Sequence, residues 1–162
     1  MSRVHVLVVM GEGGHTKQCL RLIELMGTDH YRYSYVVVAE DQVTPSKLTV
    51  EGPIYRVTRP GSIKTSIFRR FVGLPACIVQ SAIAVLASRP DAVLSTGPGV
   101  ALPVAAFARL LGARVIFVES FSRVRRLSMT GRLMRPLAHL YFVQWEDLRT
   151  MAPGAFYAGR LY

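Results

Sequence analysis

Short runs of β-branched and other apolar residues alternate along this sequence with segments of helical periodicity, and short turns separate them. This alternation is typical of a parallel sheet with helices packed on it, because each crossover helix returns the chain to the same edge of the sheet. The runs at residues 4–10 and 35–39 are continuously apolar, as expected for strands that are covered on both sides. We therefore predict an α/β fold with a single Rossmann-like, doubly wound parallel sheet. Further strands are expected at residues 54–58, 92–95, 114–119 and 140–144, and helices at 14–26, 75–88, 101–111 and 131–139.

The length and composition fit one domain with one core. The chain has 162 residues, and 51% of them are hydrophobic. Cys19 and Cys77 lie in apolar, helical surroundings without a second cysteine or a histidine at metal-ligand spacing. We therefore expect two buried free thiols and no metal site.

Positive charge is concentrated in the middle of the sequence. The chain holds 20 Lys and Arg against 10 Asp and Glu, a formal net charge of +10. Residues 52–145 contain 13 of the basic residues and only two acids, Asp91 and Glu119. Such a field attracts nucleic acid, an anionic lipid surface or a phosphorylated substrate. Because no nucleic-acid recognition motif or aromatic repeat accompanies the charge, we expect no nucleic-acid partner.

One segment combines basic and apolar residues in the manner of helices that lie on membranes. Residues 71–88 are 18 consecutive uncharged residues, and Pro75 favours a helix that begins there. A helix over residues 75–88 is about 21 Å long, short of the roughly 30 Å hydrocarbon core, so it does not span. The segment 56–88 either contacts an anionic membrane surface or forms a core helix with a basic edge. The residues expected at the membrane are Arg69, Arg70, Phe71, Leu74 and Ile78.

Ligands of doubly wound sheets bind beyond the carboxyl ends of the strands, where four loops of this chain carry glycine-rich or polar sequence. These loops cover residues 11–15, 96–99, 119–123 and 144–145. The first two are glycine turns that lead into helices, where backbone N–H groups and the helix dipole favour an anion. Close packing of the backbone alone also explains either turn. The candidate ligands of an anion or acceptor are Gly13, Gly14, Thr96, Gly97, Pro98 and Gly99.

The first glycine turn matches a dinucleotide fingerprint only in part. Gly11 and Gly13 fit the first two positions, but Thr16 replaces the third glycine. Glu40, at the end of the second predicted strand, is the one acid placed to bind a ribose. A nicotinamide-dependent oxidoreductase is therefore a weaker alternative.

His15 and Glu119 are the candidate catalytic residues. An imidazole with an ordinary pKa of about 6.5 at the mouth of the sheet is suited to take a proton from an attacking hydroxyl, although a hydrogen bond to the next loop is a structural alternative. Glu119 ends an apolar strand, where its carboxylate would hold a sugar hydroxyl, orient His15, or pair with Arg123 or Arg126. These two arginines are also candidate ligands of a phosphate or lipid headgroup, because few acids balance them.

The loops together resemble one glycosyltransferase family. The resemblance rests on residues 119–133 (ESFSRVRRLSMTGRL), the pair Gln144 and Trp145, residues 95–103 (STGPGVALP) and the turn at 11–16 (GEGGHT). These segments are similar to the acceptor-side, membrane-associating subunit of the two-chain UDP-N-acetylglucosaminyltransferase of dolichol-linked oligosaccharide synthesis, and to its bacterial capsular and exopolysaccharide counterparts. The turn also resembles, more distantly, the amino-terminal half of the peptidoglycan glycosyltransferase.

The resemblance implies a GT-B amino-terminal half over residues 1–162, with the nucleotide-sugar domain on a partner chain. The chain would be the acceptor-binding, membrane-docking subunit of an inverting enzyme, active only with its donor-binding partner, that moves a sugar from a UDP-sugar to a polyprenyl-diphosphate-linked saccharide in polysaccharide biosynthesis. Gly13, Gly14 and His15 would face the reaction centre, and residues 96–99 and Glu119 would line the acceptor side. No cofactor is implied, and the position is peripheral, on the cytoplasmic face of the cell membrane. A non-catalytic membrane anchor that recruits the catalytic partner is the alternative.

Overall fold

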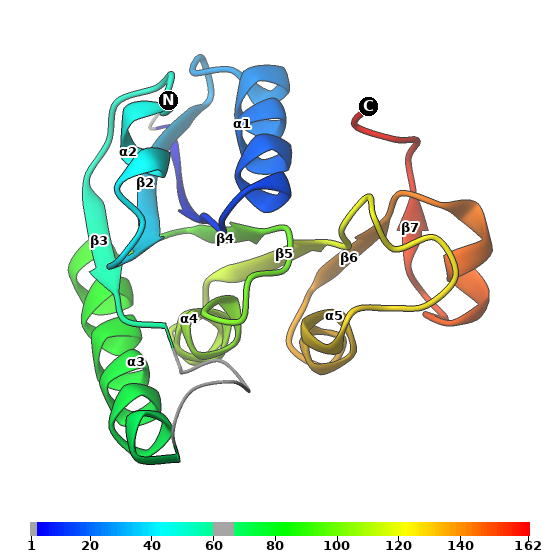
Figure 1. Cartoon of the computed structure of the whole chain (residues 1–162). Coiled ribbons are helices and arrows are strands. Elements are labelled where there is room, and N and C mark those ends of the chain that lie inside the picture. The colour runs from blue at the N-terminus through cyan, green and yellow to red at the C-terminus, as the bar shows by residue number, and fades with distance from the viewer. Residues whose placement is uncertain (1–2, 60–66) are drawn as a thin grey trace.

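A computed structural model of the chain describes residues 3–59 and 67–162, apart from the side chains of residues 67–72. Seven parallel strands form one sheet in the order β3-β2-β1-β4-β5-β6-β7 (Figure 1). The predicted α/β, doubly wound parallel sheet is thereby confirmed. The strands are β1 (Val4–Val9), β2 (Tyr31–Val38), β3 (Ile54–Val57), β4 (Ala92–Ser95), β5 (Arg114–Val118), β6 (Leu140–Val143) and β7 (Phe156–Tyr157). The helices are α1 (Gly14–Met26), α2 (Val43–Ser46), α3 (Ile67–Ser88), α4 (Ala101–Leu110), α5 (Met129–Met134) and the 3₁₀ helix η1 (Glu146–Thr150).

The strand order reverses direction between β1 and β4. The chain adds β2 and β3 on one side of β1 and β4 to β7 on the other. Because β1 pairs in parallel with both β2 and β4, the loops that leave β1 and β4 emerge next to each other. Such a switch point is where doubly wound sheets bind ligands. The two glycine turns, at residues 11–14 and 97–99, therefore meet at the expected position of a site.

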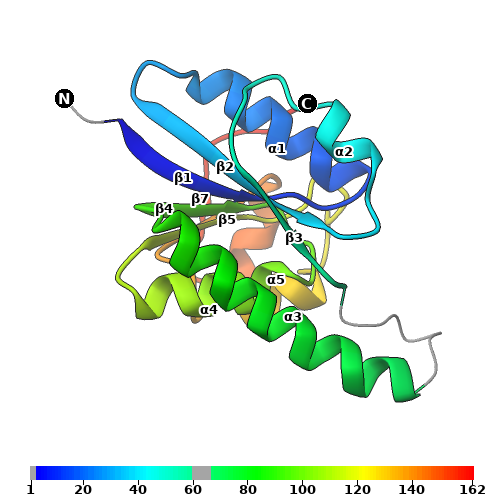
Figure 2. The same ribbon diagram turned by 90° about the vertical axis from the view of Figure 1, so that its left-hand side faces the viewer.

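Helices cover both faces of the sheet, with α1 and α2 on one face and α3, α4 and α5 on the other (Figure 2). Successive strand residues point to opposite faces. Leu7 of β1 packs in the apolar cluster that contains Cys77 of α3, whereas Val8 packs in the cluster that contains Cys19 of α1. Both cysteines are buried free thiols, as predicted.

Helix α3 departs most from the sequence prediction. It begins at Ile67 and continues through Pro75, so the predicted first-turn proline lies inside the helix and the predicted length is wrong. An internal proline loses one backbone hydrogen bond at a cost of about 3 kcal/mol, which the packing of α3 against α4 and β3 offsets. No helix in the described parts of the chain combines the length and the apolarity needed to cross a membrane.

Strand β2 begins at Tyr31, four residues before the predicted residue 35. The other differences lie in shorter elements. Helix α5 starts two residues before the predicted residue 131, because Ser128 caps it by accepting a hydrogen bond of 2.8 Å from the Gly131 N–H. It also ends well before the predicted residue 139, ahead of Pro136. The sequence did not predict α2, η1 or β7, because elements of two to five residues are too short to show a periodicity.

Candidate active site

Two glycines let the loops after β1 and β4 close around His15, which lies in the first turn of α1. A Cβ at Gly11 would lie 2.6 Å from the Cβ of His15, and a Cβ at Gly97 would lie 3.1 Å from its Cε1. Gly97 also has a φ of +119°, a backbone conformation that L side chains rarely adopt. Glycine is therefore required at both positions for the imidazole to lie between the two loops.

The ring of His15 is fixed in one orientation and one tautomer. Its Nδ1 lies 2.8 Å from the carbonyl oxygen of Thr96. Because a carbonyl only accepts hydrogen bonds, Nδ1 carries the proton and Nε2 keeps its lone pair. Desolvation by burial lowers the pKa of His15, against the smaller opposing effects of the Thr96 carbonyl and Glu119. The imidazole is therefore neutral at pH 7 and able to accept a proton at Nε2.

Thr96 holds His15 in place. It is fully buried, and its hydroxyl donates to the His15 carbonyl oxygen at 3.1 Å and lies 3.4 Å from the thiol sulfur of Cys19. The side chain of Thr96 therefore positions His15, and the prediction that Thr96 binds an anion or acceptor stays a prediction.

A pocket of about 370 Å³ opens beside His15. Arg59 and Glu12 both line it and form an ion pair of 2.6 Å, with each side chain about half exposed. No side chain caps the start of α1 at Gly13, so the first backbone N–H groups of this helix remain without a capping partner. The pocket thus combines a guanidinium, a carboxylate and an imidazole, and the residues on either side of the start of α1, Glu12 and His15, both line it. Its lining is Gly11, Glu12, His15, Val38, Arg59, Pro98, Gly99 and Val100.

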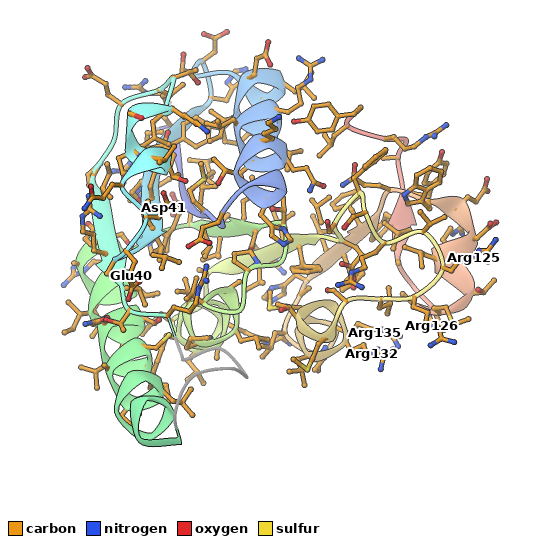
Figure 3. All side chains as sticks on the ribbon, in the orientation of Figure 1. Glu40, Asp41, Arg125, Arg126, Arg132 and Arg135 are labelled. Carbon is orange, nitrogen blue, oxygen red and sulfur yellow. The ribbon has the colours of Figure 1, made fainter. Side chains whose placement is uncertain are left out.

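Thr16 stands where a dinucleotide fingerprint has its third glycine, and its side chain has a structural role. Thr16 is buried, donates its hydroxyl to the carbonyl oxygen of Gly11, and lies 3.2 Å from the hydroxyl of Thr44. In a dinucleotide fingerprint the third glycine allows close packing of the helix on the strand, and here the buried Thr16 side chain occupies that position. Glu40 lies with Asp41 in a separate hollow of about 580 Å³ (Figure 3).

Glu119 is fully buried and does not line the pocket beside His15. Its Oε1 accepts a hydrogen bond of 2.9 Å from the Ser120 N–H, and its Oε2 accepts bonds of 3.1 Å from the Ser128 N–H and from the Tyr141 hydroxyl. Burial and this contact together raise the pKa of Tyr141. The alternative of an ion pair with a neighbouring arginine is wrong, because these three donors already hold the carboxylate. Glu119 thus fixes the loop that follows β5.

Gly131 makes room for this carboxylate. A Cβ at Gly131 would lie 2.0 Å from Oε2 of Glu119 and 2.7 Å from the Tyr141 hydroxyl. Neither of these buried groups has space to retreat. Sequence reasoning missed Gly131, because its contact residue Glu119 is twelve positions away and belongs to another element.

A second polar network joins the β5 loop to α1 and β6. Gln18 accepts hydrogen bonds at Oε1 from the Gln144 side chain at 2.5 Å and from the Phe121 N–H at 3.0 Å. Gln144 also donates to the carbonyl oxygen of Glu119 at 3.0 Å. Trp145 donates its indole N–H to the Phe121 carbonyl oxygen at 2.7 Å. These bonds hold the β5 loop against the helix that carries His15, so the four predicted loops do gather at one edge of the sheet.

Residues 6–161 match a family model that is described as "Oligosaccharide biosynthesis protein Alg14 like". The chain belongs to the Alg14 family. This assignment confirms the resemblance drawn from the loops, and with it the prediction of a glycosyltransferase subunit.

Curated relatives of this Alg14 family member are similar over most of its length. The mouse protein named UDP-N-acetylglucosamine transferase subunit ALG14 is 30% identical over 184 residues, covering 98% of this chain and 83% of the mouse protein. The Schizosaccharomyces pombe protein of the same name is 31% identical over 176 residues, covering 96% of this chain and 82% of its own length.

Solved structures share the fold of the Alg14 family chain at low sequence identity. Acinetobacter baumannii MurG superposes with a TM-score of 0.70 at 21% identity, covering 97% of this chain and 44% of MurG. A UDP-N-acetylglucosamine 2-epimerase from Rickettsia bellii superposes with a TM-score of 0.72 at 13% identity, covering 99% of this chain and 46% of the epimerase. The Alg14 family chain thus spans less than half of each of these structures.

The other predicted ligands are distributed around the pocket of the Alg14 family chain. Pro98 and Gly99 line the pocket beside His15, whereas Gly13 lines the neighbouring hollow. Gly14 begins α1 and is exposed. The exposed Arg123 follows β5, and its charge lowers the pKa of His15, so it lies at the same edge of the sheet. Arg126 is exposed further along the same loop, near α5 (Figure 3).

Helix α3 of the Alg14 family chain has one buried face and one exposed apolar face. Leu74 is 51% exposed and Ile78 is 40% exposed. Three further apolar residues of this helix are also exposed, and the five are here called the α3 apolar face: Leu74, Ile78, Val79, Ile83 and Leu86. The other face of α3 packs in the core through Cys77, Ala84 and Val85, so the helix has features of both predicted alternatives, and its contact with a membrane stays a prediction. Arg69, Arg70 and Phe71 lie in the first turns of α3, and their side chains lie outside the described part of the structure.

Proposed function

We propose that this chain is the acceptor-binding and membrane-docking subunit of a two-chain inverting glycosyltransferase that acts on a polyprenyl-diphosphate-linked saccharide. The relatives named as UDP-N-acetylglucosamine transferase subunits support a UDP-sugar as the donor, bound mainly by a partner chain. The proposal depends most on the state of His15. Its imidazole is neutral, is held in one tautomer, and lies beside a pocket at the switch point of the sheet.

In this reaction the acceptor hydroxyl oxygen attacks the anomeric carbon of the UDP-sugar. The bond between that carbon and the phosphate oxygen breaks, and UDP leaves with the electron pair. The hydroxyl proton passes to Nε2 of His15, which acts as the general base. The hydrogen bond from Nδ1 to the Thr96 carbonyl then stabilises the imidazolium, because a charged donor makes the stronger bond. Glu119 contributes by positioning the β5 loop.

The diphosphate of the acceptor fits the other features of the pocket. The uncapped start of α1 offers backbone N–H groups and the positive end of the helix dipole. Arg59 brings a guanidinium, whose charge the Glu12 carboxylate partly offsets when no ligand is bound. The saccharide that follows the diphosphate then lies against Pro98, Gly99 and His15.

The α3 apolar face supports a peripheral position on the cytoplasmic face of the cell membrane. Five exposed apolar side chains along one helix are suited to insert at the boundary between lipid headgroups and acyl chains. In Figure 2, α3 begins on the side of the sheet where β3 ends. The polyprenyl tail of an acceptor in the pocket would therefore lie near the lipid that α3 contacts.

The test measures the rate of sugar transfer from UDP-N-acetylglucosamine in three samples: the purified chain alone, its donor-binding partner alone, and a mixture of the two. One acceptor is a polyprenyl-diphosphate saccharide in anionic vesicles, and the other is a water-soluble short-chain analogue. We expect transfer only in the mixture. The double substitution Val79→Gln and Ile83→Gln is expected to lower transfer to the vesicle acceptor about tenfold, because it removes two apolar side chains from the lipid, and to leave the soluble acceptor unaffected.

The matched control is Leu25→Gln with Val43→Gln, which changes two similarly exposed apolar residues on the other face of the sheet. Equal losses in both double variants would reject docking through α3. Full activity of this chain without a partner would reject the two-chain enzyme.

A further inference from the structure

A second hollow, of about 480 Å³, lies at the end of the sheet opposite to His15. Its residues come from α5 and from the segments that precede β6 and β7, which are the amino ends of parallel strands. The pocket beside His15 lies at the carboxyl ends, so the two sites are separate. The polar and loop residues of this hollow, here called the α5 pocket, are Arg132, Arg135, His139, Tyr141, Pro153 and Gly154.

The α5 pocket carries the charges of two arginines, Arg132 and Arg135, and neither of them forms an ion pair within the described part of the chain. Arg135 donates from Nη2 to the carbonyl oxygen of Pro153 at 3.3 Å, which holds its guanidinium across the pocket. Arg132 is exposed on the same helix. Within residues 3–59 and 73–162, the ion pairs are Arg21 with Glu24 and Arg59 with Glu12, both far along the chain from α5. No acidic residue lines the pocket.

His139 adds a neutral hydrogen-bond donor. The Val115 N–H donates to its Nδ1 at 3.0 Å, so the ring proton is on Nε2. Desolvation and the charges of Arg109 and Arg114 lower the pKa of His139, which keeps the ring uncharged at pH 7. The Tyr141 hydroxyl is already committed to Glu119. The donors left in the pocket are two guanidinium groups and one imidazole N–H.

We propose that the α5 pocket binds a phosphate group. Guanidinium groups match phosphate oxygens in geometry and charge, and an imidazole N–H supplies a further donor. The volume exceeds that of a phosphate ion, which leaves room for the organic group of a phosphate ester. Helix α5 lies on the same face of the sheet as α3 (Figure 2). The ester is therefore either a lipid headgroup or a soluble phosphorylated molecule.

The test measures binding of the full chain to two probes, inorganic phosphate and vesicles of phosphatidylcholine with or without phosphatidate. Arg135→Gln is expected to weaken phosphate binding about tenfold, because it removes a charged hydrogen-bond donor. Arg3→Gln is the matched control, since Arg3 is also exposed and also donates to a backbone carbonyl, that of Thr28, at 3.5 Å, but does not line the pocket. Thermal unfolding of both variants checks that each is folded.

A loss in Arg135→Gln for both phosphate and phosphatidate vesicles, with Arg3→Gln unchanged, supports a lipid headgroup. A loss for phosphate alone supports a soluble ester. Equal losses in the two variants, or no loss in either, would overturn the proposal, because net charge would then explain any binding. The assay contains no sugar donor and no transfer step, so its outcome is independent of the proposed glycosyltransferase function.

Discussion

Replacing His15 with alanine is expected to lower the rate of sugar transfer by the complex with the donor-binding partner about 10²–10⁴-fold, the usual contribution of a general base. The loss follows from the removal of the Nε2 lone pair, which the bond from Nδ1 to Thr96 keeps free for a proton. Glu119 would not compensate, because three donors hold its buried carboxylate. The measurement is kcat with the water-soluble acceptor, together with association of the two chains.

His15→Asn separates catalysis from structure. The asparagine amide replaces Nδ1 as a donor to the Thr96 carbonyl but offers no base, so the loops stay closed while the rate falls as in His15→Ala. His30→Ala, at an exposed histidine that precedes β2, is the control and is expected to retain the wild-type rate. Near-normal transfer by His15→Asn would instead favour the non-catalytic anchor, in which His15 only holds the loop.

Gly131→Ala is expected to destabilise the fold by about 3–5 kcal/mol, a large part of the stability of a domain of this size. The new Cβ would lie 2.0 Å from a buried carboxylate oxygen of Glu119. To relieve the clash, Glu119 must give up hydrogen bonds from Ser128 or Tyr141, or α5 must move away from the sheet. The measurement is the free energy of unfolding in urea.

Gly99→Ala is the matched control, because a Cβ at Gly99 meets no atom within 4 Å. A double-mutant cycle with Glu119→Ala tests the cause of the effect. If the clash is with the Glu119 carboxylate, Gly131→Ala costs much less in the background that lacks this carboxylate. An equal cost in both backgrounds, or a cost no larger than that of Gly99→Ala, would refute the assigned contact.

The parts of this molecule that follow from local chemistry were predictable from the sequence. Short apolar and β-branched runs located the six longer strands, and the glycine-rich and polar loops after the strands indicated the edge of the sheet at which they meet. His15 was predicted because an imidazole directly after a glycine turn is placed by the turn itself. These features depend on residues that are neighbours in the sequence.

Features that depend on distant partners were not predictable. The burial of Glu119 requires Ser128 and Tyr141, which belong to a loop and to another strand. The sequence around Gln18 did not indicate a role for this residue, because its hydrogen-bond partners come from the end of β6 and from the β5 loop. The course of α3 through Pro75 depends on packing against other elements, which local proline preferences do not include.

The measurement closest to the central claim is the pH dependence of kcat/KM for the complex of this chain with its donor-binding partner. Burial lowers the pKa of His15 below its ordinary value of 6.5, and the base works only when neutral. The rate is therefore expected to be level near neutral pH, to fall as the pH drops through a value below 6.5, and to lose this acidic fall in His15→Asn. An acidic fall that persists unchanged in His15→Asn would contradict the assignment of His15 as the base.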